Sequence, residues 1–120
     1  PRRRRNYCKT TVSEMDLLGV SPDKHSLDMA VRLKEGVAAL VTGFVKLGSA
    51  PAAAAADADA ARKAERRVDK IYRRALADLF QGNEYTNLFK RREIYRHLSN
   101  AADRMAHGAS TLHDIVVKIS

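Results

Sequence analysis

Two pairs of potential metal ligands repeat one spacing in the second half of the sequence. Glu65 and Asp69 are four residues apart, and so are Asp103 and His107. Residues four apart in an α-helix project from the same face on successive turns. Carboxylates and imidazole bind zinc, iron and manganese, and metal sites in helical bundles combine such groups from facing helices. The spacing therefore makes Glu65, Asp69, Asp103 and His107 candidate metal ligands.

A structural interpretation of the same side chains stays open. They can form ion pairs with Arg62, Lys70 or Arg104, or hydrogen bonds with tyrosine hydroxyls, at the edge of an apolar seam. Such pairs are common on helix surfaces and contribute little to stability. The spacing alone does not decide between metal ligands and ion pairs.

The candidate ligands lie beside two apolar stripes with helical periodicity. Apolar residues recur at intervals of three and four, which is typical of a helix that packs with one face. The first stripe consists of Val68, Ile71, Tyr72, Ala75, Leu76, Leu79 and Phe80. The second consists of Leu88, Tyr95, Leu98, Ala102, Met105, Ala109, Leu112, Val116 and Ile119. Gly82-Asn83 interrupts the pattern, so we predict helices over 51–81 and 84–119.

Two further helices are predicted upstream. A short helix over 6–18 places apolar residues on one side, namely Cys8, Val12, Met15 and Leu18. Ser21-Pro22-Asp23 then predicts the start of a longer helix over 22–47, with Ser21 as its N-cap. We expect its inward face to consist of Leu27, Val31, Val37, Val41 and Phe44, interrupted by Lys34.

Glycines in the helix over 22–47 indicate a close helix contact. Gly36 and Gly43 each cost a helix interior about 1 kcal/mol relative to alanine, which is tolerated where another helix approaches closely. The alanines of 52–56 favour both helix formation and tight crossing. Together the elements predict an all-α fold in a single domain over 1–120. It is an antiparallel bundle of three long helices plus one short N-terminal helix, spectrin-like in form.

The charge pattern bears on the classes of partner. The formal net charge is +8, of which Arg2 to Arg5 contribute four in a basic arm over 1–5, leaving +4 for the rest. The third helix also carries a run of cations opposite its apolar stripe, made of Lys63, Arg66, Arg67, Lys70, Arg73 and Arg74. This face is either solvated or a docking surface for an acidic partner, phosphate or anionic lipid. The single cysteine, Cys8, excludes an internal disulfide and suits a reducing compartment.

Residues 64–119 resemble the C-terminal part of the PhoU-like family, which accompanies inorganic phosphate transporters. In the first helix the resemblance is carried by Glu65-Arg66-Arg67-Val68-Asp69-Lys70-Ile71-Tyr72, Ala75-Leu76 and Leu79-Phe80. In the second it is carried by Lys90, Glu93-Ile94-Tyr95, Leu98, Asp103-Arg104-Met105, Leu112 and Ile115-Val116-Val117-Lys118. The family has a Glu-x-x-x-Asp helix followed by a helix with this second pattern.

The resemblance implies a cytoplasmic, all-helical protein that regulates phosphate uptake. It implies iron, zinc or another metal ion held through Glu/Asp-x-x-x-Asp motifs, and a phosphate transporter or its regulators as partner at the inner membrane face. The sequence departs from the family at two positions, since Ser99 and His107 stand where acidic residues are usual. These departures argue against the family's multinuclear clusters and leave a smaller site.

The expected function is therefore regulatory or accessory, exercised by binding and not by catalysis. The sequence contains no Ser-His-Asp constellation, glycine-rich phosphate loop or cysteine pair, so we do not expect an enzyme. We expect His25, His97 and His113 to be surface residues. The alternative function is a basic helical nucleic-acid-binding module that uses Arg2–Arg5 and the cationic helix face. Because the short helix over 6–18 leaves apolar surface uncovered, we also predict a homodimer.

Overall fold

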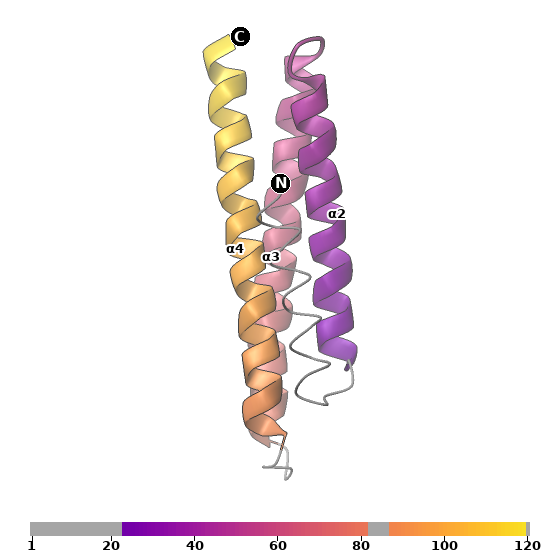
Figure 1. The fold of residues 1–120 in the computed structure, drawn as a ribbon, viewed down its shortest axis with the longest axis vertical. Coiled ribbons are helices and arrows are strands. Elements are labelled where there is room, and N and C mark those ends of the chain that lie inside the picture. The colour runs from indigo at the N-terminus through magenta and orange to yellow at the C-terminus, as the bar shows by residue number, and fades with distance from the viewer. Residues whose placement is uncertain (1–22, 82–86, 120) are drawn as a thin grey trace.

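A computed structural model describes residues 23–81 and 87–119, and in these ranges the protein is an all-α bundle of three helices. Helix α2 covers Lys24–Lys46, α3 covers Pro51–Gln81 and α4 covers Leu88–Ile119. Each runs antiparallel to the next along one common axis (Figure 1). The predicted antiparallel bundle of three long helices is confirmed. The short helix predicted over 6–18 and the arm over 1–5 lie outside the described residues.

The start of α2 differs from the prediction. Asp23 has extended backbone, and its carboxylate accepts a hydrogen bond from the backbone N–H of Ser26 at 2.8 Å. The Ser26 hydroxyl oxygen accepts in return from the backbone N–H of Asp23 at 3.0 Å. These reciprocal bonds satisfy backbone donors that the first turn leaves without intrahelical partners. Asp23 is therefore the N-cap, where Ser21 was predicted.

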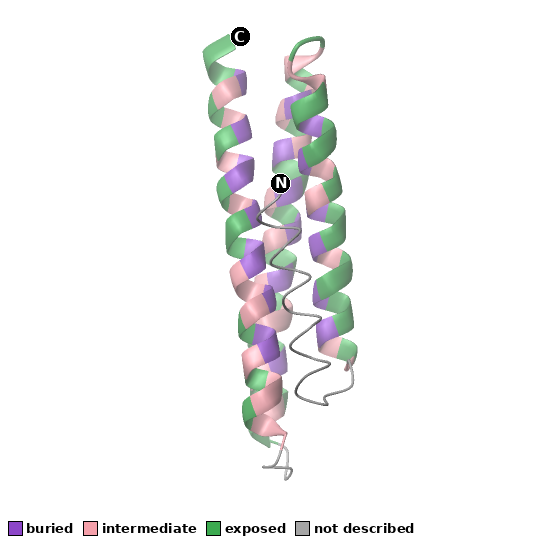
Figure 2. Ribbon diagram, in the orientation of Figure 1, coloured by how far each residue is buried: buried purple, intermediate pink, exposed green. Residues whose placement is uncertain are grey.

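The core runs along the axis between the three helices, where the buried residues of each helix face the others (Figure 2). The central part of both predicted stripes is confirmed. Val68 and Ala75 of α3 are buried, and Ile71, Tyr72, Leu76 and Leu79 pack partly buried against the core. In α4 the buried stripe includes Tyr95, Leu98, Ala102, Met105, Ala109, Leu112 and Val116. The ends of the stripes were wrongly predicted, because Phe80 and Ile119 are exposed.

The predicted inward face of α2 is wrong. The residues that α2 buries are Ser26, Met29, Leu33, Gly36, Leu40 and Gly43. Leu27, Val31 and Val41 are instead exposed, as is Phe44, and only Val37 of the predicted set packs against the core. The physical reason is that α2 is apolar on two sides, so the helical period admits two inward faces. Close packing selects the side that carries the glycines.

Gly36 and Gly43 make that packing close, as predicted. A Cβ atom added at Gly36 would collide with Met105 of α4 and lie 2.9 Å from the Ala64 Cβ of α3. One added at Gly43 would lie 2.6 Å from Leu112 Cδ2 and 3.0 Å from Asp57 Cβ. Small residues line the facing side of α3, where Ala54, Ala58, Ala61 and Ala64 are buried. The three helix axes therefore approach closely at the middle and the C-terminal part of α2.

Candidate functional site

The structure brings three of the four candidate ligands into one region at the edge of the α3–α4 seam. Glu65 and Asp69 of α3 are half-buried, and Asp103 of α4 is exposed. Partial burial raises the pKa of Glu65, and the negative charges of Asp69 and Asp103 raise it further, against a smaller opposing effect of Arg66. Asp103 of α4 is therefore near enough to Glu65 of α3 for its charge to act on that carboxyl group. These three residues are the carboxylate cluster.

The carboxylate cluster is not arranged as a preformed metal centre. No group of three or more His, Cys, Asp or Glu side chains within 23–81 and 87–119 is placed so that it could hold a metal ion. Asp69 instead forms an ion pair with Arg73, one turn further along α3, at 3.0 Å. His107 is exposed one turn beyond Asp103. A cation bound here would have to take Asp69 away from Arg73.

The basic partners proposed for these carboxylates also differ from those observed. Arg62 donates a hydrogen bond to the Ser110 hydroxyl of α4 at 3.2 Å. This bond joins α3 to α4 on the side of the cluster that is nearer the start of α3. Asp69 pairs with Arg73 in place of Arg62 or Lys70. Asp69 therefore forms an ion pair on the helix surface, but with an arginine that the sequence analysis did not name.

The raised pKa of Glu65 gives a pH-dependent prediction. When a carboxyl group has a higher pKa in the folded state, its contribution to stability is complete below the unfolded pKa. That contribution is lost as the pH rises through the folded pKa. We expect Glu65→Gln to raise the melting temperature at pH 7, measured by circular dichroism with chelator present, and to lose this advantage below about pH 4. The control is Glu35→Gln, which removes an exposed carboxylate paired with Arg32. An equal gain in both variants would contradict the prediction.

The outer face of α3 is strongly cationic. Lys63, Arg66, Arg67, Lys70, Arg73 and Arg74 are all exposed there, on the side of the helix that faces away from the core. Among residues 23–81 and 87–119, the one ion pair that this set forms joins Arg73 to Asp69. No helix within the described ranges is long and apolar enough to cross a membrane. This cationic face can meet an anionic partner from solution without any change in the bundle.

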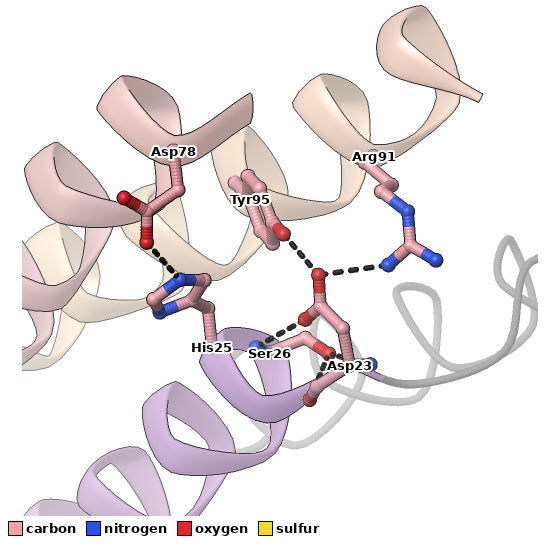
Figure 3. Close-up of polar contacts among 6 residues, drawn as sticks. All are labelled: Asp23, His25, Ser26, Asp78, Arg91 and Tyr95. Carbon is pink, nitrogen blue, oxygen red and sulfur yellow. Dashed lines mark hydrogen bonds and ion pairs between the residues drawn. The ribbon is translucent and has the colours of Figure 1, made fainter. Parts of the chain in front are cut away.

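A second polar cluster joins the start of α2 to α4, and the sequence analysis missed it (Figure 3). The Asp23 carboxylate accepts hydrogen bonds from the Tyr95 hydroxyl and from Arg91 Nη1, the latter at 2.8 Å. Partial burial alone would raise the pKa of Asp23, but the hydrogen bonds from Tyr95 and Ser26 and the charge of Arg91 together lower it. Burial and the Asp23 carboxylate raise the pKa of the Tyr95 hydroxyl, so this hydroxyl stays a donor.

His25 extends this cluster to α3. Its Nε2 atom lies 2.8 Å from the Asp78 carboxylate, and its ring meets the Tyr95 ring edge-on at a centroid distance of 6.4 Å. His25 is therefore a contact between helices and not the surface residue that was predicted. His113 also departs from its prediction, since its Nδ1 atom is buried without a hydrogen-bond partner among the described residues. The Asp-x-x-Ser spacing of residues 23–26 is a sequence signal for this N-cap, but it does not indicate the contacts with α3 and α4.

Comparisons with known proteins do not identify the chain. It matches no protein-family model, none of the curated proteins and no solved structure.

Proposed function

We propose that the chain is a PhoU-like regulatory or accessory protein of inorganic phosphate transport, acting by metal-assisted binding to a protein or membrane surface. The observation that carries the proposal is the carboxylate cluster, in which Asp103 of α4 raises the pKa of Glu65 of α3. These residues belong to the two motifs that resemble the family, and the fold sets them on neighbouring helices. The negative charges of Glu65, Asp69 and Asp103 act on one another, and a cation that drew these carboxylates together would relieve their repulsion.

The cationic face of α3 supports the binding part of the proposal. Its six exposed side chains lie between Lys63 and Arg74, over about three turns of helix. Each basic residue near an anionic membrane contributes about 1 kcal/mol of attraction, which falls off within a Debye length. A bound metal ion at Glu65 and Asp69 would release Arg73 from its ion pair and so add one free cation to this face. Metal binding and anion binding are thereby coupled through Arg73.

The experiment that tests the proposal is metal-dependent stabilisation. Ligand that binds only the folded protein adds RT ln(1 + [L]/Kd) to the free energy of unfolding, about 1.4 kcal/mol at a tenfold excess over Kd. We expect added iron, zinc or manganese to raise the wild-type melting temperature and Asp69→Asn to lose most of this gain. Without metal the two proteins should melt close together, because the Asp69–Arg73 pair is largely exposed.

Asp59→Asn is the matched control, since Asp59 is an exposed aspartate on the same helix and outside the carboxylate cluster. It should keep the full metal-induced shift. Equal shifts in wild type, Asp59→Asn and Asp69→Asn would remove the cluster from the metal site and with it the basis of the proposal. The nucleic-acid alternative predicts binding to DNA or RNA that weakens log-linearly and steeply with salt concentration.

A further inference from the structure

The outward side of α2 carries an apolar stripe that nothing in the described structure covers. Leu27 is 55% exposed, Val31 46%, Val41 48% and Val45 78%. Lys34 and Ala38 complete the stripe and are exposed too. These six residues follow one another at intervals of four, three, four, three and four, so they line up along one face of the helix. This set is the α2 stripe.

The α2 stripe is unlike the outer face of its neighbour. The equivalent face of α3 holds six basic residues, as expected for a helix that borders water. Five of the nine large apolar side chains that are exposed within the described residues belong to α2 alone. A helix that is apolar on two opposite sides is usually buried on both. The bundle covers one side of α2, so we expect a further helix to cover the other side.

We infer that the α2 stripe packs antiparallel against the α2 stripe of a second copy of this chain. The stripe reads the same in both directions about position 36. In an antiparallel pair Leu27 then lies opposite Val45 of the partner subunit, and Val31 opposite Val41 of the partner subunit. Lys34 falls opposite Ala38 of the partner subunit. A two-fold interface requires this kind of self-complementary surface.

Lys34 selects this orientation by its charge. The residues three and four away from it on its own helix are Ala30, Val31, Val37 and Ala38, none of which is acidic. In a parallel pair Lys34 would lie beside Lys34 of the partner subunit, which is repulsive. In the antiparallel pair it lies beside a small residue and within reach of the exposed carboxylate of Glu35 of the partner subunit. A lone lysine in such a seam is known to fix register at some cost in stability.

The size of the stripe limits the affinity. Helix α2 has 23 residues and is about 34 Å long, which allows one coiled-coil-like contact along its length. Stable interfaces bury about 800 Å² on each partner, and a single helix face with one charged residue provides less than this. We therefore expect weak and reversible association, as in transient complexes with small interfaces. The interface uses no residue of the cationic face of α3.

Sedimentation equilibrium of the full chain tests the interface. We expect wild type to shift from monomer to dimer over micromolar to several hundred micromolar concentrations. Val41→Lys and Val31→Lys should each weaken association at least tenfold, because they place a charge in the seam. Both positions are about half exposed, so the variants should keep the wild-type helical signal and melting temperature. The control is Val117→Lys on α4, 62% exposed and outside the stripe, which should leave association unchanged.

Disulfide trapping tests the orientation, in a Cys8→Ser background so that the new thiols are alone. We expect Leu27→Cys mixed with Val45→Cys to form a cross-linked heterodimer, whereas each variant by itself should cross-link poorly. The reverse pattern would show a parallel pair and overturn the antiparallel arrangement. A wild type that stays monomeric at several hundred micromolar, or a dimer that survives Val41→Lys, would overturn the interface itself. A wild type that stays monomeric and binds anionic vesicles, with this binding lost in Val41→Lys, would instead assign the stripe to a lipid surface.

Discussion

Replacing Gly36 by valine is expected to lower the free energy of unfolding by about 3 kcal/mol. A Cβ at this position would lie 2.7 Å from Met105 Cε and 2.9 Å from Ala64 Cβ, so α2 would have to move away from both neighbours. The end of Met105 can rotate, but Ala64 Cβ is fixed to the α3 backbone and has no rotamer to change. The better helix propensity of a residue with a side chain, less than about 1 kcal/mol, offsets only part of this cost.

Gly48 is the control for this substitution. It lies in the turn between α2 and α3, and a Cβ there would meet nothing within 4 Å. Gly48→Val should therefore change stability by less than about 0.5 kcal/mol. Thermal unfolding followed by circular dichroism at 222 nm measures both variants, and about 3 kcal/mol corresponds to a drop of more than about 10 °C for a domain of this size. Similar melting temperatures for Gly36→Val and wild type would mean that α2 does not approach α3 this closely.

Gly36 and Gly43 show both what the sequence predicted correctly about the fold and what it predicted wrongly. Their place inside a helix indicated a close contact, and Gly36 and Gly43 do lie against α3 and α4. The inward face of α2 was nevertheless assigned to Leu27, Val31 and Val41, because a hydrophobic pattern counts large apolar residues and passes over glycine. When a helix is apolar on two sides, periodicity cannot choose the inward one. The choice depends on which side the neighbouring helices can approach.

The sequence likewise predicted only part of the candidate site. The proximity of Glu65 and Asp103 could be predicted from the sequence, because each lies beside a strong helical stripe and a short connection joins the two helices. The ion-pair partner of Asp69 could not be predicted, since several basic residues lie within one turn of it and the side-chain rotamers determine which of them forms the pair. The cluster at Asp23 could not be found either. Its contacts with Arg91 and Tyr95 span 68 and 72 residues of sequence and depend on how far α2 is shifted along α4.

The position of Asp23 makes it the polar residue whose loss should cost most. Its carboxylate caps the first turn of α2 and accepts hydrogen bonds from two side chains of α4. Tyr95 is 3% exposed, so its hydroxyl cannot easily turn to water for another partner. Loss of an N-cap costs about 1 kcal/mol, and a buried donor left without an acceptor costs about 1 to 3 kcal/mol. We therefore expect Asp23→Ala to lower the free energy of unfolding by about 2 to 4 kcal/mol.

The pH dependence of stability distinguishes the contribution of the Asp23 charge from that of its side-chain shape. The pKa of Asp23 is lowered in the folded protein, so its contribution to stability is complete above the unfolded value of about 4 and is lost as the pH falls through the folded pKa. Asp23→Asn keeps a side-chain acceptor for the Ser26 N–H but has no charge for Arg91. We expect Asp23→Asn to melt below wild type at pH 7, with a difference that shrinks steadily below pH 4. Asp28→Asn serves as the control, because Asp28 is exposed and pairs with Arg32 within α2 at 3.5 Å. If Asp28→Asn lost as much stability at pH 7 as Asp23→Asn, the link from the α2 N-cap to Tyr95 and Arg91 would not hold the helices together.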